Sequence, residues 1–148
     1  MPTNLYELVL IDCSLEWSQL DILAPVLLYV ENLYLARNNC KKICSQFEIS
    51  KTYWKNLRLL NLEQNGIESW DELVGFRVLE GLQRLIINKN SIKEIYKKPG
   101  FRDLRYLSFE DNLISDWKSL NQLNEFDGKL KQIRCQGNPL FDVKDDND

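Results

Sequence analysis

Apolar residues recur along the chain at a fixed spacing. The arrangement is Leu-x-x-Leu-x-Leu-x-x-Asn-x-Leu, in which other apolar residues replace some of the leucines and cysteine replaces one asparagine. Six copies fit this arrangement, and they cover residues 5–15, 30–40, 57–67, 82–92, 104–114 and 130–140. Their first residues are 25, 27, 25, 22 and 26 positions apart. Six copies at so regular an interval indicate a protein built from internal repeats.

Each copy predicts the same local structure. The second and third leucines are two positions apart and therefore face the same side of a short strand. The asparagine follows the strand, where a buried amide can bond the backbone of neighbouring copies. This pattern is typical of leucine-rich repeats, whose units stack because none can bury its apolar face alone. We predict an α/β leucine-rich repeat solenoid (a horseshoe) of six repeats over residues 4–141, with a concave parallel β-sheet. Residues 142–148 are expected to form an acidic, disordered tail.

The segments between the repeats predict short helices and irregular turns on the convex side. Ser69 and Glu72 have the spacing of a capping box at the start of a helix. Helical turns are expected in repeats one, three and five, whereas segments 47–53 and 95–100 are expected to be irregular. A tryptophan follows the last repeat position in three copies, as Trp17, Trp70 and Trp117. Their helical spacing from other apolar residues predicts that these tryptophans lie in the core, with ligand binding as the alternative.

Composition and charge narrow the classes of function. The 148 residues carry a net charge of −3 and a pI of about 5.1, which gives no basic field for nucleic acid. The chain has no histidine, which excludes Ser-His-Asp, Cys-His and His-ligated metal sites. Its longest apolar run, residues 22–30, is too short to cross a membrane. We therefore expect a soluble, cytoplasmic protein that is not an enzyme, with no catalytic, cofactor-binding or metal-binding residue.

The four cysteines match no zinc or disulfide framework. Cys13, Cys40 and Cys135 occupy positions of the repeat and are predicted to be buried and reduced. Cys44 lies outside the repeat, and a Cys40–Cys44 disulfide or metal pair stays open as an alternative.

The concave strand face is the candidate binding surface, because solenoids generally bind partners there. Arg58, Arg84, Arg105, Lys131 and Arg134 are expected to gather towards one edge of it, and Glu63, Glu110 and Asp111 towards the other. Arginine and tyrosine are enriched in the residues that dominate binding interfaces. A mixed-charge surface that serves only solubility is the alternative. The predicted protein-binding residues are Tyr34, Arg58, Leu59, Arg84, Ile86, Arg105, Tyr106, Glu110 and Arg134.

The last two repeats resemble a particular family. Residues 101–117 contain the run Asn-Leu-Ile-Ser-Asp-Trp, and residues 135–140 read Cys-Gln-Gly-Asn-Pro-Leu. Both stretches, together with residues 57–70, resemble the leucine-rich repeat domain of tubulin-folding cofactor E (tubulin-specific chaperone E). The resemblance covers about residues 4–141.

The resemblance implies a role in folding, assembly and disassembly of the α/β-tubulin heterodimer. The implied partners are α-tubulin or the heterodimer, which is acidic, other tubulin-folding cofactors and an Arf-like GTPase, and the implied location is cytoplasmic and cytoskeleton-associated. In that family, CAP-Gly and ubiquitin-like domains flank the repeats, and neither is present here, so we expect one domain of a longer protein. The alternative function is an adaptor for another intracellular protein, of the phosphatase-regulator, axonemal or spliceosomal type.

Overall fold

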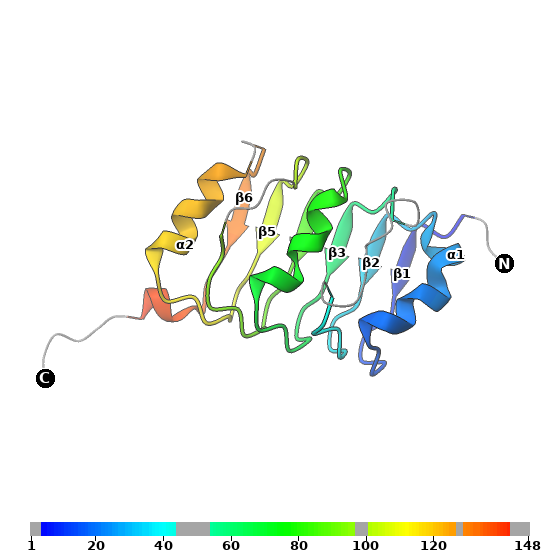
Figure 1. Ribbon diagram of the computed structural model, residues 1–148, viewed down its shortest axis with the longest axis horizontal. Helices are drawn as coiled ribbons and strands as arrows, with labels where there is room; N and C mark the ends of the chain where they lie inside the picture. The colour runs from blue at the N-terminus through cyan, green and yellow to red at the C-terminus, as the bar shows by residue number, and fades with distance from the viewer. Residues whose placement is uncertain (1–3, 44–53, 97–100, 127–128, 143–148) are drawn as a thin grey trace, which may run out of the picture.

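The computed structural model describes residues 4–43, 54–96, 101–126 and 129–142. In these residues the chain forms one open, six-stranded parallel sheet whose strands follow one another in chain order (Figure 1). Each strand is three residues long, and each coil of the chain adds one strand beside the last. The strands are β1 (Glu7–Val9), β2 (Asn32–Tyr34), β3 (Leu59–Asn61), β4 (Arg84–Ile86), β5 (Tyr106–Ser108) and β6 (Gln132–Arg134). The predicted parallel sheet is confirmed, and its form fits an α/β solenoid.

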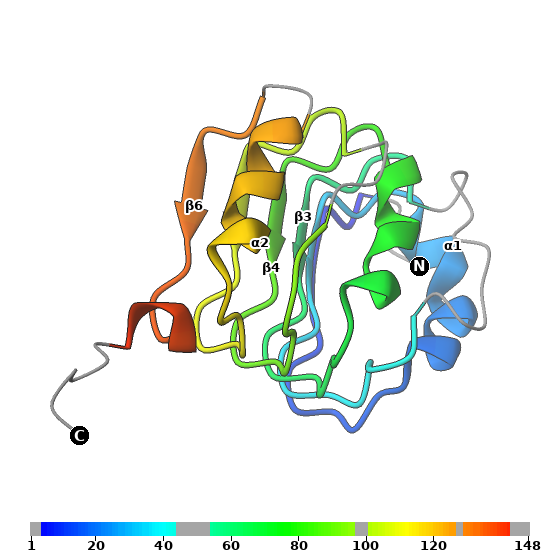
Figure 2. The same ribbon diagram turned by 60° about the vertical axis from the view of Figure 1, so that its left-hand side comes forward.

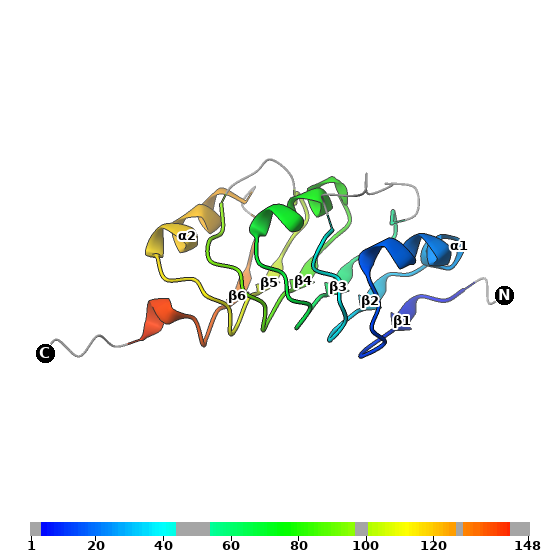
Figure 3. The same cartoon turned by 60° about the horizontal axis from the view of Figure 1, so that its bottom comes forward.

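Short helices cover one face of the sheet, and the other face carries none in the described part of the chain (Figure 2 and Figure 3). They are η1 (Trp17–Leu23), α1 (Ala24–Leu27), η2 (Trp70–Glu72), η3 (Val74–Val78), α2 (Trp117–Gln122), η4 (Leu123–Glu125) and η5 (Pro139–Phe141). The helical turns predicted in repeats one, three and five are present, mostly as 3-10 turns.

Side chains cap the N-terminus of two of these helices. Ser69 Oγ accepts from Asp71 N at 3.2 Å, and Asp116 Oδ1 accepts from Lys118 N at 2.7 Å. Glu72 links neighbouring coils, because its carboxylate accepts from Ile43 N at 2.7 Å. Segment 47–53 and residues 97–100, for which irregular structure was expected, lie outside the described residues.

The central residues of the strands form an apolar column inside the sheet. Leu33, Leu60, Leu85 and Leu107 are fully buried. The repeat predicts that Leu8 and Ile133, at the same position of their strands, complete a buried column, and this prediction is wrong at both ends, where Leu8 is half-buried and Ile133 is 42% exposed. Each internal strand is covered by a coil on both sides, whereas β1 and β6 have a neighbour on one side only.

Aromatic side chains fill the space between the sheet and the helices. Trp17 stacks on Trp54 with ring centroids 5.4 Å apart, and Trp70 stacks on Phe126 at 6.1 Å. Both predictions of core positions are therefore confirmed. The same prediction for Trp117 is wrong, because that side chain is 60% exposed. Trp117 begins α2, where its ring has an edge-on contact with Phe141 of η5, with ring centroids 5.7 Å apart.

A ladder of buried asparagines joins the coils, as the repeat predicts. Asn90 is representative, because its Oδ1 accepts from Asn65 N and Ile67 N of the preceding coil, both at 3.0 Å. Its Nδ2 donates to Leu62 O at 3.1 Å and to Ile87 O at 2.9 Å. The buried members of the ladder are Asn38, Asn65, Asn90, Asn112 and Asn138.

The burial of each cysteine depends on the coil in which it lies. Cys40 is fully buried, and burial, with a smaller contribution from Glu16, raises the pKa of its thiol to about 12. The predicted burial of Cys13 is wrong, since its side chain is exposed in the first coil, whose strand β1 is an edge strand of the described sheet. Cys135 is only partly buried in the last coil, so its predicted burial is also incomplete, and these three thiols are free. Cys44 lies outside the described residues.

Candidate protein-binding surface

The strand face without helices, called the open face here, is built from the first and third residue of every strand. Because the strands pair without a shift in register, these residues form two straight columns across the sheet. The first column is Glu7, Asn32, Leu59, Arg84, Tyr106 and Gln132. The second column is Val9, Tyr34, Asn61, Ile86, Ser108 and Arg134. Neighbouring members lie one strand spacing apart, roughly 4.8 Å.

The structure brings most of the predicted binding residues onto this face. Three follow one another in the first column, namely Leu59, Arg84 and Tyr106, and three lie in the second, namely Tyr34, Ile86 and Arg134. Arg58 and Arg105 directly precede β3 and β5, and Glu110 follows β5 by two residues. All four arginines are exposed, whereas the apolar and aromatic members and Glu110 are half-buried.

Arg84 and Tyr106 form the best-defined contact of the open face. They are register partners on β4 and β5, and the guanidinium carbon of Arg84 lies 4.5 Å from the centroid of the Tyr106 ring. A cation–π contact of this kind is worth about 0.5–1 kcal/mol at an exposed site. Arg84 remains exposed beside the ring, so its guanidinium can pair with a carboxylate of a partner.

A second basic group lies beside the starts of the strands. Lys129 Nζ donates to Asp103 Oδ1 at 2.6 Å. This hydrogen bond and the charge of Lys129, followed by the charges of Arg105 and Arg58, hold the pKa of Asp103 below its usual value. Arg58 and Arg105 are therefore close enough to act on one carboxylate. With Lys131, which has the same place before β6, they give the strand starts a positive charge.

The predicted single basic edge is only partly correct. Arg58, Arg105 and Lys131 do share one position in the coil, but Arg134 lies in the second column, two residues further along its strand. A residue before a strand and a residue at the end of that strand lie about 7–10 Å apart. The spacing of the repeat is therefore enough to separate Arg134 from the other three side chains.

A polar network on the open face was not predicted. The hydroxyl of Ser108 donates to Asn88 Oδ1 at 2.7 Å, and Glu110 N donates to the same oxygen at 2.8 Å. Asn88 Nδ2 completes the network by donating to Glu110 Oε2 at 3.3 Å. Ser108 is fully buried by it, although it occupies an outward position of β5. Each residue type is common on surfaces, so only the register of β4 and β5 reveals the network.

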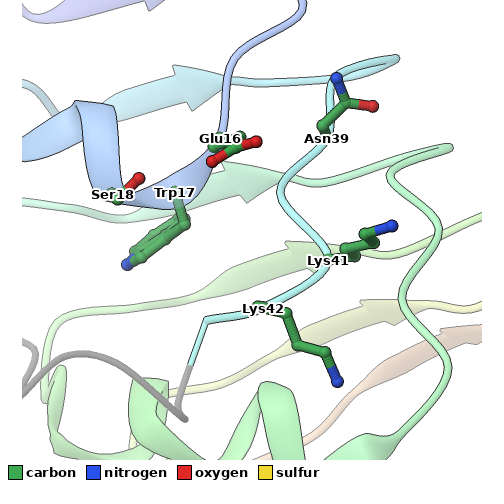
Figure 4. Close-up of a pocket in the computed structure, with 6 residues that line it drawn as sticks. All are labelled: Glu16, Trp17, Ser18, Asn39, Lys41 and Lys42. Carbon is green, nitrogen blue, oxygen red and sulfur yellow. The ribbon is translucent and has the colours of Figure 1, made fainter.

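The helix side offers shallow polar hollows. One, of about 210 Å³, is lined by the start of η1 and the neighbouring coil (Figure 4), with Glu16, Ser18, Asn39, Lys41 and Lys42 around Trp17. Another, of about 440 Å³, lies between Tyr96 and α2. Burial and the Asp71 carboxylate raise the pKa of Tyr96 above its ordinary range. Within the described ranges no three His, Cys, Asp or Glu side chains gather as a metal site requires.

Comparison with known proteins finds similarity to proteins of one kind. The sequence is 33% identical over 150 residues to tubulin-folding cofactor E of Arabidopsis thaliana, an alignment that includes 94% of this chain and 28% of that protein. It is 31% identical to tubulin-specific chaperone E of Danio rerio, over 87% of this chain and 25% of that protein. The mouse tubulin-specific chaperone E is 29% identical over 93% of this chain and 27% of its own length. This chain is homologous to a segment of tubulin-folding cofactor E. No protein-family model matches the chain.

The similarity to cofactor E confirms the resemblance found in the repeats. The chain spans about a quarter of the length of these relatives, so most of each relative has no counterpart in this chain. None of the described helices has the length and apolar character that a membrane span requires.

Proposed function

We propose that the chain is a protein-binding module of a tubulin chaperone and takes part in folding, assembly and disassembly of the α/β-tubulin heterodimer. The proposal is carried by its similarity to tubulin-folding cofactor E over 94% of the chain. The module is a solenoid of six leucine-rich repeats, which the asparagine ladder and the register of the sheet support. It acts by binding rather than by catalysis, in the cytoplasm and with the cytoskeleton. Other tubulin-folding cofactors and an Arf-like GTPase are its further partners.

Tubulin binds the open face over strands β3 to β6. Tubulin is acidic, and Arg58, Arg84 and Arg105 offer exposed guanidinium groups that pair with carboxylates in a two-pronged geometry. Tyr106 and Ile86 lie beside them as half-buried anchors of the kind that dominate binding energy. The net charge of −3 opposes the approach of an acidic partner. Screening acts over roughly 8 Å at physiological salt, so the local arginines outweigh that distant charge at contact.

Reversal of two charges tests this surface. The double variant Arg84→Glu/Arg105→Glu should weaken binding to purified α/β-tubulin at least tenfold, equivalent to about 1.4 kcal/mol. Stability should change little, because both side chains are exposed. The measurement is the dissociation constant by biolayer interferometry, with the unfolding midpoint of each variant as a check.

A matched control separates position from total charge. Arg77 and Arg102 are also exposed and lie outside the strands of the open face, so Arg77→Glu/Arg102→Glu changes the net charge equally. This control should bind tubulin within threefold of the parent chain. Tubulin binding that survives the Arg84 and Arg105 reversal would move the contact off the open face. If the parent chain captures another intracellular protein but no tubulin, it is an adaptor of a different kind.

A further inference from the structure

A row of side chains crosses the sheet where the strands begin, all at one edge (Figure 1). The residues directly before strands β3 to β6, called the strand-start row here, are Arg58, Gln83, Arg105 and Lys131. Backbone hydrogen bonds join each member to the next. Gln83 N donates to Arg58 O at 2.8 Å, and Arg105 N donates to Gln83 O at 2.9 Å. Lys131 N donates to Arg105 O at 2.9 Å, so the row is held straight at the spacing of the strands, roughly 4.8 Å.

The strand-start row has a positive charge in a chain whose net charge is −3. Its three cations, Arg58, Arg105 and Lys131, are all exposed. Two positions before the row in each coil, Lys129 adds a fourth cation and Asp103 is the single acidic residue. Within the described residues the three cations of the row form no ion pair of their own.

The charges around the row do not cancel it. The positions four and five residues before these strands are neutral in sum, because they hold Lys55, Arg102, Glu80 and Asp127. Asp142 lies at the opposite edge of the sheet, where the strands end, since it follows η5 (Figure 2). In the coil of β2 the position of the row is taken by Glu31. The positive charge is therefore confined to the coils of β3 to β6.

Asp103 shows that this edge can hold a carboxylate. Lys129 Nζ donates to Asp103 Oδ1 at 2.6 Å across the junction of two coils. The hydrogen bond and the charge of Lys129, followed by the charges of Arg105 and Arg58, lower the pKa of Asp103. The Asp103 carboxylate is thus paired with Lys129 and leaves the three cations of the row to a partner.

The dimensions of the row fit an extended polypeptide. Arg58 and Lys131 are separated by three strand spacings, which is roughly 14 Å. In an extended chain every second side chain faces the same side, and the first and fifth residues are about 13 Å apart. Three carboxylates at alternate positions of such a segment therefore match the three cations. Gln83 fills the gap between Arg58 and Arg105 with an amide that can donate to a backbone carbonyl.

The row is better suited to carboxylates than to a nucleic acid. A guanidinium group pairs with a carboxylate through two parallel N–H donors. Recognition of a nucleic acid relies on a broad basic field, which a chain with a net charge of −3 does not provide.

We propose that the strand-start row binds an extended, acidic segment of tubulin, which crosses the strands with its carboxylates on Arg58, Arg105 and Lys131. The inference rests on the proposed function and names the part of the partner that this edge takes. Because the pairs are exposed, the binding weakens as salt concentration rises. Asp103 opposes the segment, since it is an acidic group of the chain itself that occupies Lys129 beside the row.

Fluorescence anisotropy of a fluorescein-labelled peptide of ten glutamates tests the proposal on the full chain. The parent chain should bind the peptide about fivefold more weakly at about 200 mM salt than at about 20 mM. Arg58→Glu/Lys131→Glu should weaken the binding about tenfold, because it replaces two attractive pairs by repulsion. Asp103→Asn should strengthen the binding about threefold, because it releases Lys129 and removes a repelling charge.

A matched control separates position from total charge. Asp21 is exposed on η1, which lies on the helix side of the sheet. Asp21→Asn makes the same change of net charge as Asp103→Asn and should leave the affinity for the peptide within about 1.5-fold of the parent.

The gain from Asp103→Asn is the decisive result, since damage to the fold cannot produce it. An affinity that is the same in Asp103→Asn as in the parent would overturn the proposal. So would a parent chain that fails to bind the peptide at concentrations up to about 500 μM. A single strand of ten thymidines that binds more tightly than the peptide at equal salt would show that the row is a phosphate site instead.

Competition with tubulin separates this inference from the proposed function. The glutamate peptide should displace α/β-tubulin from the parent chain. If tubulin binds and a saturating amount of peptide does not displace it, the inference is wrong and the proposed function stands. If the peptide binds and tubulin does not, the proposed function is wrong, and the assignment of the segment to tubulin is wrong with it.

Discussion

Replacing Leu60 by alanine should lower the free energy of unfolding by about 3–5 kcal/mol. Leu60 is fully buried at the centre of the apolar column, where β3 pairs with Leu33 of β2 on one side and Leu85 of β4 on the other. Truncation removes the transfer free energy of the side chain and leaves a cavity that two rigid neighbours cannot close. Equilibrium unfolding in urea, followed by circular dichroism, measures the change.

The same substitution at the end of the column is the control. Leu8 has the register position of Leu60 but is only half-buried, because β1 pairs on one side only in the described sheet. Leu8→Ala should therefore cost less than half as much as Leu60→Ala. Equal losses at the two positions would contradict a stability that arises from the stacking of coils.

Asn90→Ala should cost about 3 kcal/mol or more, even though it removes few apolar atoms. The amide oxygen of Asn90 satisfies Asn65 N and Ile67 N, and its amide nitrogen donates to Leu62 O and Ile87 O. Alanine leaves these backbone groups buried without their partner, at about 1–3 kcal/mol for each group that stays unsatisfied. Urea unfolding measures this loss as well.

Asn121→Ala tests whether the cost belongs to the ladder. Asn121 is exposed on α2, where alanine is a good helix former, so its loss should change stability by less than about 0.5 kcal/mol. A small effect of Asn90→Ala would show that water or relaxed backbone replaces the amide at no great cost. The ladder would then not be a principal source of stability.

Much of the fold could be predicted because each coil repeats one physical problem. The spacing of apolar residues predicts the order, direction and register of the strands, and the asparagine position predicts the ladder. The ends could not be predicted in this way, since the pattern of Ile133, Trp117 and Cys13 is the same as that of internal residues. Their exposure follows from the lack of a neighbouring coil, which is a property of the stack and not of the repeat.

Backbone conformation is another feature that the repeat did not reveal. The residue before the asparagine or cysteine position has a positive φ, between 54° and 72°, in all six coils. Only Gly137 among them is a glycine, and a side chain there would also collide with the carboxylate of Asp111. The other five coils adopt this conformation with aspartate, arginine, glutamine or lysine, at a cost of about 1–2 kcal/mol each. The regular stack overcomes the local preference of these residues.

The candidate binding surface could also be predicted only in part from the sequence. Its members could be listed from the alternation along each strand, but their pairing depends on the register between strands. Arg84 over Tyr106 and the network around Asn88 join residues about 20 positions apart in sequence. No local pattern distinguishes these residues from solvated surface side chains.

Hydrogen exchange of the chain with and without α/β-tubulin locates the tubulin contact. Tubulin should slow exchange in strands β3 to β6 and in the residues just before them, while η1, η3 and α2 exchange as in the free chain. Slower exchange confined to the helix face would contradict the open face as the tubulin contact. Unchanged exchange throughout, at tubulin concentrations well above that of the chain, would contradict tubulin binding by these coils.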